Sequence, residues 1–135
     1  MRVIQILAVV LALLPFSAKA QSVDADIRAV IQGQIDAFCA NDVAKAFSFA
    51  SPMIKGMFRT PENFGQMVQN GYPMVWRPAD VRFSELRDFG GRKVQSVLIT
   101  DLGGKDFIAD YEMIETPEGW QINGVAIREA EGVGV

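Results

Sequence analysis

The stretch FIADYEMIETPEGWQINGVAIR, residues 107–128, decides the fold. Two segments rich in β-forming residues, 107–114 and 120–128, flank Thr116-Pro117-Glu118-Gly119. Proline in the second position and glycine in the fourth are typical of a type I turn. The stretch therefore predicts a β-hairpin.

Two more strands are expected before this hairpin. Residues 81–84 alternate apolar and polar side chains, and residues 94–100 place Gln95, Val97 and Ile99 on one face. Glycine pairs at positions 90–91 and 103–104 mark the turns between strands. Consecutive strands with short glycine-bearing connections pair antiparallel, so the sequence predicts a four-stranded meander.

The spacing before the strands is helical. In residues 24–39 apolar side chains recur every three or four positions, which predicts an amphipathic helix capped by Asp24 or Ser22. Shorter helices are expected after three further capping residues: Asn41, Ser51 before Pro52, and Thr60 before Pro61. The predicted fold class is α+β, with N-terminal helices packed on a four-stranded antiparallel sheet in one domain over residues 21–135.

Residues 1–20 form a predicted signal peptide. Arg2 gives a basic start, residues 3–14 are apolar except for Gln5, and Ala18 and Ala20 occupy the small-residue positions of a cleavage site. The apolar run is shorter than the ~20 residues that span a bilayer. We therefore expect cleavage after Ala20, a periplasmic or secreted protein, and no stable membrane anchor in the mature chain.

The composition excludes several kinds of site. The chain has no His and one Cys, which rules out a Ser-His-Asp triad, His-ligated zinc and an internal disulfide. The net charge of −3 argues against nucleic-acid binding, because such domains carry a basic excess. No motif for a cofactor or a metal is recognised. Cys39 ends the apolar stripe of the first helix, so we expect a small buried side chain, with an intermolecular disulfide as the alternative.

The hairpin carries apolar residues on both faces. Phe107, Tyr111 and Met113 share one face of their strand, and Ile108 lies on the other. Strict alternation along residues 120–128 puts Val125 and Ile127 on the opposite face from Ile122. The solvated face of an antiparallel sheet is normally polar. We therefore expect a second copy to cover the outer face, in a homodimer that Ile108→Lys or Val125→Lys weakens.

The order of helices and strands resembles the nuclear transport factor 2-like, or cystatin-like, cone fold. Specific segments also resemble an uncharacterised family of exported bacterial domains of unknown function, and GYPMVWRP is the most specific of them. These segments are DIRAVI at 26–31, AFSFASP at 46–52, GYPMVWRP at 71–78, DYEM at 110–113 and GWQINGV at 119–125. The resemblance covers nearly all of residues 21–135 and implies a fold, but it supplies no activity.

Domains that resemble this cone often hold a pocket between the first helix and the concave face of the sheet. We expect such a pocket to bind a small apolar or amphipathic molecule, or a protein partner, without catalysis. As ligand-binding residues, Trp76 would stack on a ligand and Arg77 would pair with a carboxylate. The favoured interpretation of this segment is structural, with Trp76 and Tyr72 closing the open end of the cone. The candidate ligand-binding residues are Phe64, Tyr72, Trp76, Arg77, Tyr111 and Met113.

Two alternatives stay open. Some relatives of the cone fold are acid–base lyases or isomerases, which here would use Tyr72 or Tyr111 with Asp36 or Asp110 as the base. The missing His disfavours this reading, and Asp110 is expected to face away from Tyr111. The second alternative is a structural dimeric domain that uses the outer face of the sheet.

Overall fold

The computed structural model describes residue 12 and residues 18–130. In this part of the chain five helices precede four strands, which confirms the predicted order. The helices are α1 (Ala18–Cys39), α2 (Val43–Ser48), α3 (Pro52–Phe58), α4 (Pro61–Gly71) and α5 (Pro73–Trp76). The strands are β1 (Asp80–Asp88), β2 (Arg92–Thr100), β3 (Asp106–Thr116) and β4 (Gly119–Glu129).

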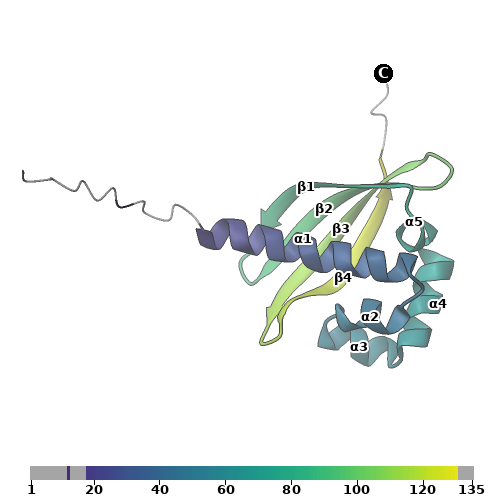
Figure 1. Cartoon of the computed structure of the whole chain (residues 1–135), viewed down its shortest axis with the longest axis horizontal. Coiled ribbons are helices and arrows are strands. Elements are labelled where there is room, and N and C mark those ends of the chain that lie inside the picture. Colours follow the sequence, from purple (N-terminus) through teal and green to yellow (C-terminus); the bar gives the residue numbers. More distant parts are fainter. Residues whose placement is uncertain (1–11, 13–17, 131–135) are drawn as a thin grey trace, which may run out of the picture.

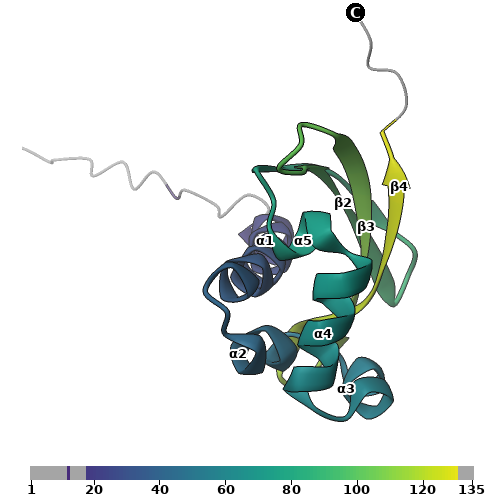
Figure 2. The ribbon, with the colours of Figure 1, turned by 90° about the vertical axis from the view of Figure 1, so that its right-hand side faces the viewer.

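The four strands form one antiparallel sheet in the order β1-β2-β3-β4, as the meander predicts. Helix α1 lies across one face of this sheet (Figure 1). The other helices gather near the C-terminal end of α1, where α5, α4 and α3 stand beside the sheet (Figure 2). None of the helices in residues 18–130 is both long and apolar enough to cross a membrane.

The first helix buries the predicted stripe. Ile27, Ile31, Ile35 and Phe38 are all inaccessible or nearly so, because they recur on one side of α1 and face the sheet. The helix begins at Ala18, so the predicted caps Asp24 and Ser22 are wrong. Alanine, lysine and glutamine in residues 18–21 favour a helix, which continues through both capping candidates.

Two of the three capping residues predicted for the short helices are confirmed. The Ser51 hydroxyl accepts from the Ile54 N–H at 3.3 Å, and the Thr60 hydroxyl accepts from the Asn63 N–H at 3.1 Å. Asn41 is not a cap, because its backbone is left-handed at φ 58° and its carboxamide oxygen accepts from Arg77. Asp42 caps α2 instead.

The core lies between α1 and the sheet. The faces predicted for β2 and β3 are confirmed, since Gln95, Val97 and Ile99 on β2 are buried together with Phe107, Tyr111 and Met113 on β3. Beside this layer, Phe64 on α4 packs its ring 5.8 Å from Phe38 and 5.3 Å from Phe47. Aromatic packing therefore ties α4 to α1 and α2.

Strand β4 contains a β-bulge that changes which side chains face the core. Tyr111 lies opposite Val125 and Met113 opposite Ile122. Only Glu112 separates the two residues of β3, whereas Asn123 and Gly124 separate their partners, so β4 holds one extra residue.

The bulge overturns the expected alternation along β4. Ile122 and Val125 both lie on the core face, and Val125 and Ile127 pack against the core cluster. The prediction that Val125 and Ile127 face outward is therefore wrong, because one inserted residue reverses the alternation beyond it.

The bulge also attaches the start of α3 to the sheet. The Ser51 hydroxyl donates to the Asn123 carboxamide oxygen at 2.7 Å, and the Ser51 N–H donates to the Ile122 carbonyl at 2.8 Å. The Ile122 N–H in turn donates to the Phe49 carbonyl at 2.9 Å. The chain between α2 and α3 is thus fixed along the edge of β4.

Deletion of Asn123 should lower the free energy of unfolding by about 2–4 kcal/mol. Without the extra residue one half of β4 must turn its apolar side chains outward, and the bond to Ser51 is lost. Urea titration measures the effect. Asn123→Ala keeps the residue count and should cost only about 1–2 kcal/mol. A deletion variant as stable as the Asn123→Ala variant would contradict the role given to the bulge.

Candidate functional site

One pocket opens between the helices and the edge of the sheet. It has a volume of about 240 Å³, and its walls come from the C-terminal half of α1, from α3, α4 and α5, and from β4. Its lining residues are Gln34, Phe38, Ala50, Ile54, Met57, Phe58, Phe64, Met67, Val68, Tyr72, Val75, Ile122, Gly124 and Val125.

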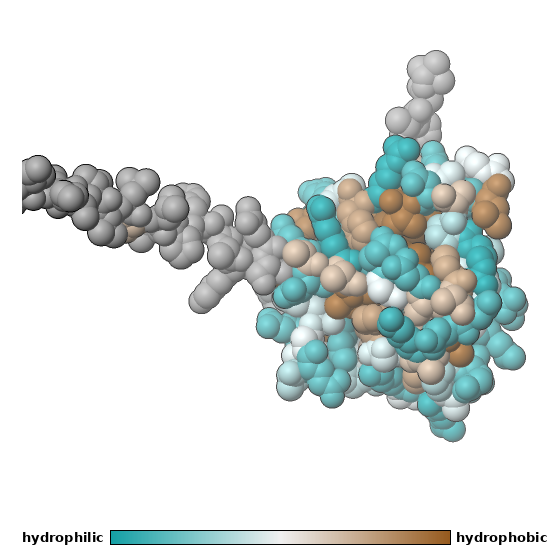
Figure 3. Space-filling view, viewed as in Figure 1, coloured by the Kyte–Doolittle hydropathy of each residue, from teal (hydrophilic) through white to brown (hydrophobic). Residues whose placement is uncertain are grey.

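The wall formed by α3 is the least buried. Ile54, Met57 and Phe58 line the pocket, yet α3 has no fully buried residue and Met57 is 62% exposed. The opposite wall includes Ile122 and Val125, which the bulge turns inward. Seen from the side of α1, the molecular surface is mostly polar with small apolar patches (Figure 3). The pocket is therefore an apolar hollow whose most exposed wall is α3.

The lining is uncharged throughout. Its polar side chains are the carboxamide of Gln34 and the hydroxyl of half-buried Tyr72. Gln34 is buried, and its Nε2 donates to the Ala46 carbonyl at 3.1 Å. A pocket of this kind can hold a neutral, largely apolar molecule and orient it through a few polar groups.

Of the six residues predicted to bind a ligand, Phe64 and Tyr72 line this pocket. Trp76 lies behind it, with its ring centroid 5.5 Å from that of Phe38. The Arg77 guanidinium stacks on Trp76 at 4.7 Å and donates to the carbonyls of Phe38 at 2.6 Å and Trp76 at 2.7 Å. Arg77 thus satisfies a carbonyl in the last turn of α1 and joins that helix to α5.

The other two predicted residues, Tyr111 and Met113, lie in the core and do not line the pocket. Both are 0% exposed. The Tyr111 hydroxyl has no hydrogen-bond partner among the described residues, and burial raises the pKa of this hydroxyl well above its ordinary value. The ligand-binding role of all six residues stays a prediction.

The two carboxylates considered as bases lie outside the pocket. Asp36 is exposed and accepts from Gln32 Nε2 at 2.9 Å. Asp110 points to the outer face of the sheet, away from Tyr111 as expected, and accepts from the Ser96 hydroxyl at 2.6 Å. Within the described residues, no three His, Cys, Asp or Glu side chains form a group that could hold a metal ion.

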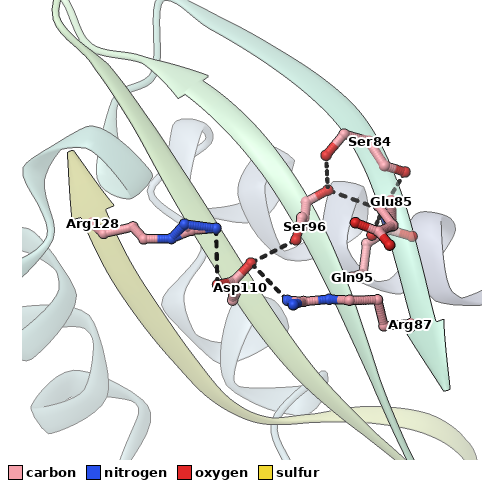
Figure 4. Close-up of polar contacts among 7 residues, drawn as sticks. All are labelled: Ser84, Glu85, Arg87, Gln95, Ser96, Asp110 and Arg128. Atoms are coloured by element: carbon pink, nitrogen blue, oxygen red, sulfur yellow. Dashed lines mark hydrogen bonds and ion pairs between the residues drawn. The ribbon is translucent and has the colours of Figure 1, made fainter. Parts of the chain in front are cut away.

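Asp110 is the centre of a polar cluster on the outer face (Figure 4). Arg87 approaches it at 3.5 Å from β1 and Arg128 at 3.6 Å from β4. On the core face of β2, Gln95 Nε2 donates to the carbonyls of Ser84 at 3.1 Å and Ser96 at 3.0 Å, next to the irregular pairing of β1. The outer face therefore carries charged side chains around Asp110, and the dimer through this face stays a prediction.

The expectation that the Cys39 side chain is buried is wrong, because Cys39 is exposed. It lies four residues after buried Ile35, on the same side of α1, but it is the last residue of the helix, and the buried part of the stripe ends at Phe38.

The sequence did not identify Gln34, α3 or β4 as parts of the pocket lining. For Gln34 a clue was present, since a polar residue stands within the apolar stripe between Ile31 and Phe38. The β4 wall depends on the bulge, which alternation alone does not reveal.

Tyr111→Phe should leave the free energy of unfolding at neutral pH unchanged or raise it by up to about 2 kcal/mol. It removes a buried hydroxyl that has no partner. Because burial raises the pKa of Tyr111 above its ordinary 10.0, the stability that depends on its proton is complete below that pH and is lost as pH rises above it. The variant should lose less stability at alkaline pH than the wild type.

Urea titrations of wild type and Tyr111→Phe across neutral and alkaline pH test this expectation, with Tyr72→Phe as the control. A clear loss of stability in Tyr111→Phe at neutral pH would show that the hydroxyl has a partner.

Comparison with known proteins identifies the family and the fold. The model of a domain of unknown function, DUF4864, matches residues 20–135. A search of curated proteins gave no match. The chain is similar to the crystal structure of a domain of unknown function with a cystatin-like fold from Nostoc punctiforme, with 15% identity and a TM-score of 0.58 over 83% of this chain and 80% of that chain. This similarity confirms the cystatin-like α+β fold and extends no further. The chain belongs to the DUF4864 family.

Proposed function

We propose that this protein binds a small apolar molecule without catalysis, in the pocket between α1, α3, α4 and β4. The observation that carries the proposal is the pocket itself, which has a volume of about 240 Å³ and a lining of uncharged, mainly apolar side chains. Solvent-accessible apolar hollows of this kind are a common form of ligand site.

The volume suggests the size of the molecule. An apolar cavity of about 150 Å³ in a protein core can take one benzene molecule. By proportion, a pocket of about 240 Å³ suits a ligand with roughly ten non-hydrogen atoms. Aromatic side chains of α1, α3 and α4 line it, namely Phe38, Phe58 and Phe64, so a ring or a short branched chain would find dense contacts.

Binding is favoured over acid–base chemistry because the lining residues include no carboxylate. A general base must come within hydrogen-bond reach of the proton that it removes. Asp36 is exposed on α1 and Asp110 lies on the far face of the sheet. Tyr72 is the one titratable side chain of the lining.

The proposal includes export by residues 1–20. Three features of these residues support export: the basic start, the apolar run, and the small residues Ala18 and Ala20 at the predicted cleavage site. Residues 1–11 and 13–17 lie outside the described part of the chain, and α1 begins at Ala18.

Export predicts that the full chain expressed in a bacterial host is recovered from the periplasm or medium with Gln21 as its first residue. Mass spectrometry of the purified protein measures this. Ala20→Trp should block cleavage, because the cleavage site needs small residues. A cytoplasmic protein that retains residues 1–20 would contradict the export proposal.

The pocket predicts stabilisation by a neutral apolar probe of matching size, para-propyltoluene. At about ten times its dissociation constant, this probe should stabilise the protein by about 1.4 kcal/mol and raise the melting temperature by about 5 °C. Ile54→Trp places a larger side chain on the pocket wall and should abolish the shift. Met53→Trp is the matched control, since Met53 is a neighbour on α3 that is 54% exposed and does not line the pocket.

Differential scanning calorimetry and titration calorimetry measure the shift and the affinity. Equal shifts for Ile54→Trp and Met53→Trp would mean that the probe binds elsewhere. No shift in the wild type would count against an apolar binding pocket.

A further inference from the structure

The Gln34 carboxamide is the most deeply placed polar group of the pocket. Gln34 is 3% exposed and stands on the buried side of α1 among the lining residues. Its Nε2 donates to the backbone carbonyl of Ala46. A carbonyl can only accept, so this bond fixes the orientation of the carboxamide and identifies Oε1 as its remaining end.

The Oε1 atom of Gln34 is an acceptor without a donor from the protein. None of the hydrogen bonds formed within the described residues ends on it, whereas the Nε2 atom of the same group is satisfied. Oε1 is not among the fully buried side-chain atoms that lack a partner, so solvent can reach it, and a ligand that displaces this solvent must supply a donor in its place.

We propose that the pocket selects neutral ligands that carry a hydroxyl group on an apolar body, and that Gln34 Oε1 accepts the hydroxyl hydrogen. This inference rests on the proposed binding function. It adds the chemical class of the ligand and the residue that recognises it.

The uncharged lining explains why the ligand is neutral. A carboxylate or an ammonium group that enters the pocket loses its water and finds no opposite charge among the lining residues, so the loss of hydration is not offset. A hydroxyl group is a better match, because it can donate to Gln34 and also accept from the Tyr72 hydroxyl on the pocket wall.

A site whose acceptor loses its solvent when a ligand binds also discriminates against molecules without a donor. A hydrocarbon of the same shape fills the pocket but leaves Gln34 Oε1 unpaired. The discrimination should disappear when the acceptor is removed, while binding of the hydrocarbon remains.

Two probes of nearly equal shape test the inference. They are para-propylphenol and para-propyltoluene, which differ by a hydroxyl in place of a methyl group. Titration calorimetry gives the dissociation constant of each probe for the wild type, for Gln34→Met and for Gln32→Met. Comparing the ratio of the two constants between the wild type and each variant cancels the difference in hydrophobicity between the probes.

Gln34→Met should shift this ratio against the phenol by about five- to tenfold, which corresponds to the loss of one hydrogen bond. Gln32→Met is the matched control on α1. It removes an exposed bond to Asp36, and its residue does not line the pocket, so the ratio should stay within about twofold of the wild type.

A second measurement is independent of variant folding. In the wild type, the NMR resonance of the Gln34 side-chain amide should move more on addition of para-propylphenol than on addition of para-propyltoluene. Equal movements would overturn the inference.

The outcomes separate this inference from the proposed function. If neither probe binds the wild type, the apolar pocket itself fails as a site. If both probes bind and the ratio is the same in wild type and Gln34→Met, the pocket stands and the selection by Gln34 is wrong. If Tyr72→Phe shifts the ratio and Gln34→Met does not, recognition belongs to Tyr72.

Discussion

The β-bulge at Asn123 is the local irregularity on which the candidate site depends. By adding one residue to β4, it places Ile122 and Val125 on the same face and lets both line the pocket. The same irregularity presents Asn123 to Ser51, which begins α3 and thereby positions the opposite wall. The bulge thus positions both sides of the pocket: the shifted strand pairing turns Ile122 and Val125 inward, and the hydrogen bond between Ser51 and Asn123 fixes the start of α3.

Much of the fold was predictable because it follows from local chemistry. Ser51 and Thr60 cap their helices through side-chain oxygens, and glycine at the hairpin turn adopts a positive φ of 103° at Gly119. The bulge was not predictable from alternation, because its extra residue is chosen by contacts with a distant segment. The start of α1 was also missed, since good helix formers continued the helix past two residues that could have capped it.

The candidate site was predictable only in part. Phe64 and Tyr72 were named as candidate ligand-binding residues of the pocket that the resemblance to the cone fold implies, and both line the pocket. Trp76 and Arg77 come from the same segment as Tyr72, GYPMVWRP at 71–78, but they hold the end of α1 through stacking and carbonyl contacts. The residue type did not separate these roles, because a tryptophan and an arginine suit a ligand and a helix end equally well. The distinction depends on which partners the fold places within reach.

The exposure of α3 has a consequence for how the pocket exchanges its contents. This helix has no fully buried side chain, so detaching it from the body uncovers little apolar surface and requires less free energy than detaching α1. Its backbone amides should therefore exchange with deuterium sooner than those of α1. The rate at which a bound molecule leaves would then be governed by the opening of one short helix, while the sheet and α1 stay intact.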